Sequence, residues 1–213
     1  MNPNVPTFVP TVPTFSLTEP SLAVKAAPEA NTTSTSPSLK DKGILFISDI
    51  INSNVAQNVV SWILEANMDT ERKYDHLTLI INSPGGEMPS AFAIIDTIAG
   101  SRIPVHTVGL GQISSCGFLI FISGAKGYRI LTPNTTILSH QWFWGNVGKA
   151  HELLGVTKQY NFINERMEAH YVRHTGLDIE TIRTRLLPPT DTWLSADEAK
   201  EMGICDEIRL VSA

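Results

Sequence analysis

Three adjacent side chains that could attack a carbonyl carbon lie in the stretch GQISSCG, residues 111–117: Ser114, Ser115 and Cys116. A short turn of small residues after an apolar run is a place where an α/β protein can expose a reactive hydroxyl. Serine becomes an effective nucleophile only when a general base within hydrogen-bond distance removes its proton, and a third group usually orients that base. The stretch therefore offers three candidate nucleophiles, and the rest of the chain has to supply a base and an acid.

The base is expected to be a histidine, because only the imidazole has an unperturbed pKa close to neutral pH. His140 is the best candidate, since it ends a short predicted strand, TTILSH, and catalytic groups collect at the ends of strands. The other five histidines have ordinary structural explanations in predicted strands or in a long helix: His76, His106, His151, His170 and His174.

A pair of glycines in the turn Ser83-Pro84-Gly85-Gly86 follows another predicted strand. Such a pair lets the backbone approach a ligand closely and direct N–H groups at developing negative charge. A tight strand-to-helix turn with positive φ would explain the same glycines. Because GQISSCG follows one strand later, the pattern favours a site that binds an oxyanion.

These residues lie within an alternation of strand and helix patterns that begins at residue 43. Strands are expected at residues 43–47, 76–82, 102–110, 128–132, 135–140 and 204–211. Helices are expected at residues 53–66, 87–99, 149–173 and 178–187, with a short one opened by a capping box from Ser195 to Glu198. The apolar run CGFLIFISGA, residues 116–125, fits a buried helix or a strand. The alternation predicts an α/β domain with both faces of its sheet covered.

Residues 1–41 have a different composition, crowded with Pro, Thr, Ser and Asn, which predicts a disordered tail before a folded domain of residues 42–213. The tail lacks the basic start and unbroken apolar core of a secretory signal. No later stretch reaches the roughly 18 apolar residues that a membrane span needs. We therefore expect no association with a membrane.

The charged residues and cysteines exclude further classes. The net charge of −5, without a run of Lys and Arg, argues against a nucleic-acid surface. Two cysteines, Cys116 and Cys205, are too few for a disulfide framework, and no His/Cys cluster suggests a metal. We expect a cytoplasmic protein that needs no metal or cofactor.

Several motifs then follow one another in a specific order: INSPGG (81–86), GQISSCG (111–117), GAKGYR (124–129), LTPN (131–134), SHQ (139–141), HTG (174–176) and LSADEAKEMGICDEI (194–208). Together they resemble the proteolytic subunit of the Clp protease, ClpP, from about Gly43 to the C-terminus. The resemblance implies a crotonase-like α/β fold, which is a spiral of ββα units with a protruding handle helix. The predicted helix at residues 149–173 corresponds to the handle.

Position by position, the resemblance implies a catalytic triad. Ser115 would be the nucleophile and His140 the general base. Asp191, two positions before the aromatic residue of DTWLSA, would be the acid. The backbone amides of Gly86 and Cys116 would form the oxyanion hole, which makes the thiol of Cys116 incidental.

Some positions depart from the family pattern. Trp142 replaces the usual proline after the HQ pair, and Trp144-Gly145 replaces a glycine pair, so bulky rings could reshape the peptide-binding strand. The strand LTLII before INSPGG lacks the aromatic residues at which an unfoldase docks. A second nearby carboxylate, Asp197, lies inside the predicted capping box and is better explained as a charge in the first turn of a helix.

The resemblance implies stacked heptameric rings of this chain that cut proteins or peptides inside a chamber. An ATP-dependent AAA+ unfoldase would feed the chamber through a divergent docking surface, as in a specialised member such as a phage-encoded one. A non-catalytic or regulatory subunit of a mixed protease ring is the alternative, motivated by the altered strand and tail. Another crotonase-type chemistry, such as acyl-CoA turnover, would leave the Ser/His/Asp set without a purpose.

Overall fold

The computed structural model of the chain describes residues 38–143, 145 and 147–211. Most of the predicted tail, residues 1–37, lies outside this described part. A 3-10 turn, η1 (Lys40–Lys42), precedes the first strand, and Gly43 follows it in a left-handed conformation with φ 72°.

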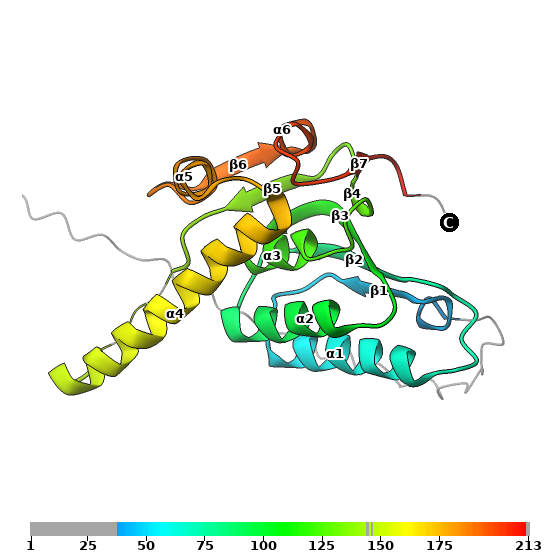
Figure 1. Cartoon of the computed structure of the whole chain (residues 1–213), viewed down its shortest axis with the longest axis horizontal. Coiled ribbons are helices and arrows are strands. Elements are labelled where there is room, and N and C mark those ends of the chain that lie inside the picture. The colour runs from blue at the N-terminus through cyan, green and yellow to red at the C-terminus, as the bar shows by residue number, and fades with distance from the viewer. Residues whose placement is uncertain (1–37, 144, 146, 212–213) are drawn as a thin grey trace, which may run out of the picture. The chain divides into compact units, whose positions relative to one another are not determined.

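The strands of the described residues form one mostly parallel sheet (Figure 1). Its main path runs in the order β1 (Ile44–Ile47), β2 (Leu77–Ser83), β3 (Val105–Ser114), β4 (Arg129–Leu131) and β7 (Glu207–Ile208). The long strand β3 pairs with β4 through its first half and with β5 (Thr136–Ser139) through its last residues. Strand β6 (Thr192–Ser195) adds to β5 as the antiparallel pair of the sheet.

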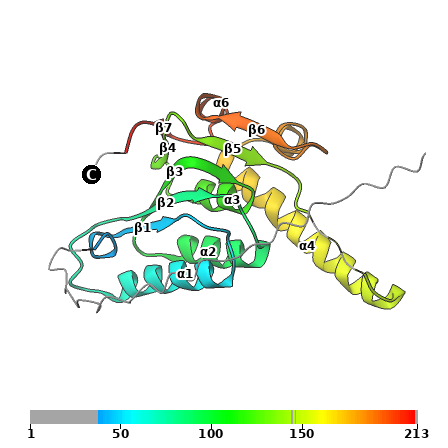
Figure 2. The same ribbon diagram turned by 180° about the vertical axis from the view of Figure 1, so that it is seen from behind.

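The helices are α1 (Ser53–Met68), α2 (Met88–Gly100), α3 (Cys116–Ile122), α4 (Ala150–Thr175), α5 (Ile179–Thr181) and α6 (Ala196–Glu201). A turn of π-helix, Ile182–Leu186, continues α5. Helices α1 and α2 run side by side along one side of the strands, as the two opposite views show (Figures 1 and 2). The sequence therefore predicted the order of these elements correctly, while β6 was missed and the last strand is shorter than expected.

Only one face of the sheet is covered by helices in the described part, so the prediction of two covered faces was wrong. Leu45, Leu79 and Ile81 alternate along β1 and β2 and are buried in the core with the helices. The residues between them point to the opposite face, where Phe46 is exposed and Thr78 is half-buried. The alternation of partly buried with fully buried side chains is that of a sheet with one solvated face.

The apolar run that the sequence left undecided forms a helix. All seven residues of α3 are buried. Helix α3 contacts β3 and β2 of the sheet and also α2 and α4. A helix enclosed on every side is apolar all round, which removes the periodicity that would have identified it.

Helix α4 is packed against the protein along its C-terminal half and extends away from it along its N-terminal half (Figures 1 and 2). Ile163, Met167 and Tyr171 are buried, whereas Leu154 is 74% exposed. Gly176 ends the helix with φ 78°, and its N–H donates to the carbonyl oxygen of Val172.

Candidate active site

Ser115 is the single residue between strand β3 and helix α3, because β3 extends to Ser114 and α3 begins at Cys116. The sequence had predicted a longer turn over residues 111–117. Ser115 has φ 51° and ψ −119°, and within the described part it is the only residue other than glycine with a positive φ. Strain of this kind costs roughly 1–3 kcal/mol and is retained mainly at functional sites. The strand–turn–helix arrangement is also one that exposes a nucleophile.

Burial separates the three candidate nucleophiles. Ser114 is completely buried, and its Oγ accepts a hydrogen bond of 2.8 Å from Nε2 of Gln112. Cys116 is also buried, and its thiol donates to the carbonyl oxygen of Gly86. Burial raises the pKa of the Cys116 thiol to about 11, which disfavours the nucleophilic thiolate. Ser115 is partly exposed and lines a cavity, so it is the accessible hydroxyl of the three.

The glycine turn packs directly against Ser115. A Cβ atom added to Gly85 would lie 2.7 Å from Cβ of Ser115, and one added to Gly86 would lie 2.1 Å from the carbonyl oxygen of Ile51. Only glycine allows both contacts, and both residues have positive φ, 98° and 154°.

Backbone hydrogen bonds on either side of Gly86 hold this turn in place. The N–H of Ile51 donates to the carbonyl oxygen of Gly85, and the N–H of Glu87 donates to the carbonyl oxygen of Ile51, each at 2.8 Å. Among the described residues, the N–H groups of Gly86 and Cys116 donate to no acceptor on another residue. Two donors that another molecule could use therefore lie on the two segments that meet at Ser115.

His140 follows β5 and reaches the same end of the sheet as Ser115. Leu138 of β5 is in register with Ser114 of β3, and its carbonyl oxygen accepts the N–H of Ser115 at 2.8 Å. Both Ser115 and His140 line one cavity of about 440 Å³. Within the described part no hydrogen bond joins their side chains. Nδ1 of His140 is bonded to the carbonyl oxygen of Gln141, so Nδ1 carries the proton and Nε2 is left with a lone pair.

Asp191 immediately precedes β6, as His140 immediately follows β5. Strand β6 pairs antiparallel with β5, and the register sets Thr192 opposite Ser139. His140 and Asp191 are the next residues along the chain beyond this last pair of the ladder. Asp191 is exposed, and among the described residues no hydrogen bond or ion pair connects it with His140. Asp197 lies in the first turn of α6, beside a capping box formed by Ser195 and Glu198.

A buried pair of hydroxyl groups lies directly behind His140. Oγ of Ser139 and the hydroxyl of Tyr171 are 2.8 Å apart, and both side chains are buried. Tyr171 also contacts the ring of Phe118 edge to face, so it links α4, α3 and β5. Sequence reasoning missed this pair, because Tyr171 is simply one apolar position of a predicted helix.

The remaining wall of the cavity comes from two helices and from the segment after His140. Trp142, Phe143, Gln159 and Ile163 line it on one side. Glu87, Met88 and Pro89, at the start of α2, line it on the other. Trp142 stacks on Tyr160 with ring centroids 5.1 Å apart. Of the two tryptophans that the sequence marked as unusual, Trp142 is thus part of the cavity, and Trp144 lies outside the described residues. Glu87 was not anticipated.

The other described histidines that make specific contacts lie away from the cavity. His106 stacks between His76 and Tyr128 on the exposed face of the sheet. Nε2 of His170 is 2.9 Å from the carbonyl oxygen of Leu119. The described residues include no group of three or more His, Cys, Asp or Glu side chains arranged to hold a metal. In the same part of the chain, no helix combines the length and the apolar character needed to cross a bilayer.

Comparison with known families gives one match that spans most of the chain. The family model described as Clp protease matches residues 28–211. The match covers every strand and helix around the cavity, and it includes Ser115, His140 and Asp191.

Proposed function

The chain belongs to the Clp protease family, and we propose that it is a serine endopeptidase with Ser115 as its nucleophile. The observation that supports the proposal most directly is the backbone of Ser115, which is strained at φ 51° in a one-residue turn. This conformation presents the hydroxyl to a cavity that also receives His140 and the Gly86 turn. A serine, a base and free amide donors around one space are what acyl transfer requires.

In the proposed reaction, Nε2 of His140 takes the proton of Ser115 while the serine oxygen attacks a peptide carbonyl. The N–H groups of Gly86 and Cys116 donate to the resulting oxyanion, and each such donor contributes about 3 kcal/mol in comparable enzymes. The imidazolium then gives its proton to the leaving amine. Water repeats the sequence on the acyl-enzyme and releases the second product.

Asp191 is proposed to orient His140 by replacing the carbonyl oxygen of Gln141 at Nδ1. His140 and Asp191 are the residues immediately beyond the last β5–β6 pair, Ser139 and Thr192, so we propose that a change of side-chain rotamers brings the two side chains together. The carboxylate would also stabilise the imidazolium, which a neutral carbonyl does less well.

Assembly into stacked heptameric rings that enclose the active sites, with ATP-dependent feeding by a AAA+ unfoldase, is part of the same proposal. The exposed N-terminal half of α4, with Leu154 and Phe162 on its surface, supports its role as the handle between rings. The helix-free face of β2, with the half-buried Thr78 and Ile80, is the surface on which we propose that the unfoldase docks. We propose a cytoplasmic location for this machine.

A non-catalytic or regulatory subunit of a mixed protease ring is the second candidate. The observation that favours it is the hydrogen bond from His140 to Gln141, together with the lack of a bond between Asp191 and the imidazole among the described residues. A subunit that keeps this arrangement in the ring would have an unoriented base and would shape a protease without cutting.

Labelling of the purified full chain with a fluorophosphonate, which reacts with activated serines, tests the proposal. We expect labelling of the wild type and of Ser114→Ala, and none of Ser115→Ala. Ser114→Ala is the matched control, because Ser114 is adjacent but buried. Native mass and peptide hydrolysis are measured on the same samples. Unlabelled protein in an assembled ring would instead support the regulatory subunit.

A further inference from the structure

One carboxylate, Glu87, lines the cavity beside Ser115, and we propose that this cavity binds a lysine or arginine side chain of the substrate. The inference rests on the proposed function and names the class of peptide that the site prefers. The side chain concerned belongs to the residue that supplies the scissile carbonyl, because the cavity adjoins both Ser115 and the amide of Gly86.

The cavity has walls suited to a long aliphatic stem. Met88 and Ile163 are largely buried beneath it, and Trp142 and Phe143 add aromatic faces. A volume of about 440 Å³ is ample for one large side chain. Lys and Arg bury their methylene groups on apolar surface while the charged end stays near polar partners. Aromatic faces also attract a cation.

The charge of the cavity is negative. Of the described residues that line it, Glu87 and His140 are the only ones that titrate, and Gln159 adds a neutral amide. Glu87 precedes the first turn of α2, at the positive end of the helix dipole. Oε2 of Glu87 accepts a hydrogen bond of 2.9 Å from Oγ of Ser90, which orients the group.

The same charge would oppose catalysis if nothing compensated it. Besides burial, which is the larger cause, the charge of Glu87 helps to raise the pKa of the Cys116 thiol, so it acts on the residue whose amide is proposed to bind the oxyanion. A negative charge there disfavours a second one that develops in the transition state. A cationic substrate side chain beside Glu87 cancels this repulsion, whereas an apolar or acidic one does not.

Peptides that differ only at the residue before the cleaved bond, Lys, Met or Glu, test the inference. For the wild type we expect kcat/KM for the Lys peptide to exceed that for the Met peptide by roughly tenfold, with the Glu peptide slowest. Glu87→Gln keeps an oxygen that accepts from Ser90 but removes the charge. It should lower kcat/KM for the Lys peptide about tenfold and raise that for the Met peptide. Glu71→Gln, at an exposed carboxylate that lines a different cavity, is the matched control.

Binding of the same peptides to Ser115→Ala, with and without Glu87→Gln, measures the preference without chemistry. A Lys preference that disappears in Glu87→Gln supports the inference even if the wild type is never labelled, in which case only the proposed protease activity fails. Equal affinity for the Lys and Met peptides, or a Lys preference that survives Glu87→Gln, overturns the inference. If Ser115 is still labelled in the wild type, the proposed protease activity is supported even though the inference about Glu87 has failed.

Discussion

Ser115 and Gly86 have backbone conformations that few residues adopt, and each is held by a neighbouring segment. The N–H of Ser115 is bonded to Leu138, and Gly86 lies against the backbone of Ile51. These contacts bring the end of β3, the start of α2 and the strand before His140 to one point. The cavity therefore depends on the absence of a side chain at Gly86 as much as on the reactive side chains of Ser115 and His140.

Replacement of Gly86 by alanine should destabilise the protein and abolish labelling at Ser115. The added Cβ would lie 2.1 Å from the carbonyl oxygen of Ile51, and backbone atoms cannot move aside cheaply. We expect a loss of about 2–4 kcal/mol in the free energy of unfolding, measured by denaturant titration.

Gly100→Ala is the control for this substitution. Gly100 ends α2, and no heavy atom outside the chain neighbours and local helix backbone lies within 4 Å of an added Cβ there. The free energy of unfolding of Gly100→Ala should stay the same or rise by up to about 1 kcal/mol. Similar stabilities for the two variants would show that the Gly86 turn is not tightly constrained.

Helices α3 and α4 are joined through His170. The ring is buried, and Nε2–H donates to the carbonyl oxygen of Leu119 in the last turns of α3. Burial, with smaller contributions from His174 and Arg173, lowers the pKa of His170 to about 4. Since α3 begins immediately after Ser115, this contact helps to hold the helix that carries one proposed oxyanion donor.

Acid should therefore destabilise the wild type through His170. His170 binds a proton with a pKa of about 6.5 in the unfolded chain but of about 4 in the folded protein. The contribution of the neutral ring to stability is therefore fully present above pH 6.5 and is lost as the pH falls toward 4. Between pH 7 and pH 5 the loss should be about 2 kcal/mol from this group.

His170→Gln is the comparison variant, because its amide can still donate to Leu119 but does not titrate. Denaturant unfolding at several pH values should show a shallower loss of stability for the variant than for the wild type. Parallel curves for the two proteins would mean that His170 is protonated as readily in the folded state as in the unfolded chain.

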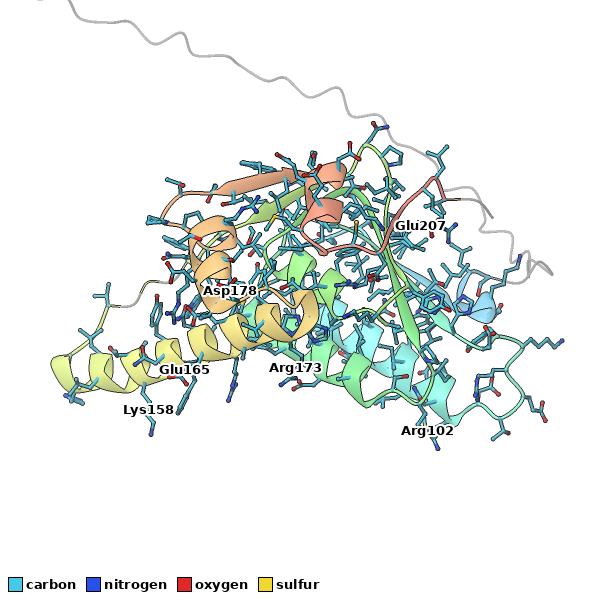
Figure 3. All side chains as sticks on the ribbon, turned by 45° about the horizontal axis from the view of Figure 1, so that its top comes forward. Arg102, Lys158, Glu165, Arg173, Asp178 and Glu207 are labelled. Carbon is cyan, nitrogen blue, oxygen red and sulfur yellow. The ribbon has the colours of Figure 1, made fainter. Side chains whose placement is uncertain are left out.

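The N-terminal half of α4 leaves the body of the described protein and carries exposed apolar side chains. Leu154 is 74% exposed and Phe162 is 46% exposed. Figure 3 shows Lys158 of the same half projecting away from the remainder of the protein. In the proposed assembly of stacked rings, these side chains would be covered by another subunit.

Leu154→Glu should halve the native mass of the assembled protein if α4 joins two rings. A carboxylate buried in a contact between equivalent helices would leave each copy with an unpaired charge. Native mass spectrometry measures the result, and Leu39→Glu, at an exposed apolar position outside α4, is the control. An unchanged mass for Leu154→Glu would exclude α4 from the contact between rings.

The order of strands and helices was predictable from the sequence because local periodicity and turn residues determine it. Strand β6 was not, since it exists through its pairing with β5, and the last strand was predicted too long, since β7 has only two residues. The sequence likewise did not reveal that helices cover only one face of the sheet. Residues such as Thr78 and Ile80 fit a face covered by helices as well as one without them, and only the packing of the whole domain distinguishes the two.

By itself the sequence determined the chemical types at the candidate site, a serine turn, a histidine at a strand end and a glycine pair, because these follow from residue identity and short-range order. Only the tertiary structure decided that Ser114 and Cys116 are buried while Ser115 is accessible. It also decided that no bond joins Asp191 to His140 among the described residues and that Glu87 lines the cavity. Burial and contact between segments far apart in the chain are set by packing of the whole domain, which no local pattern contains.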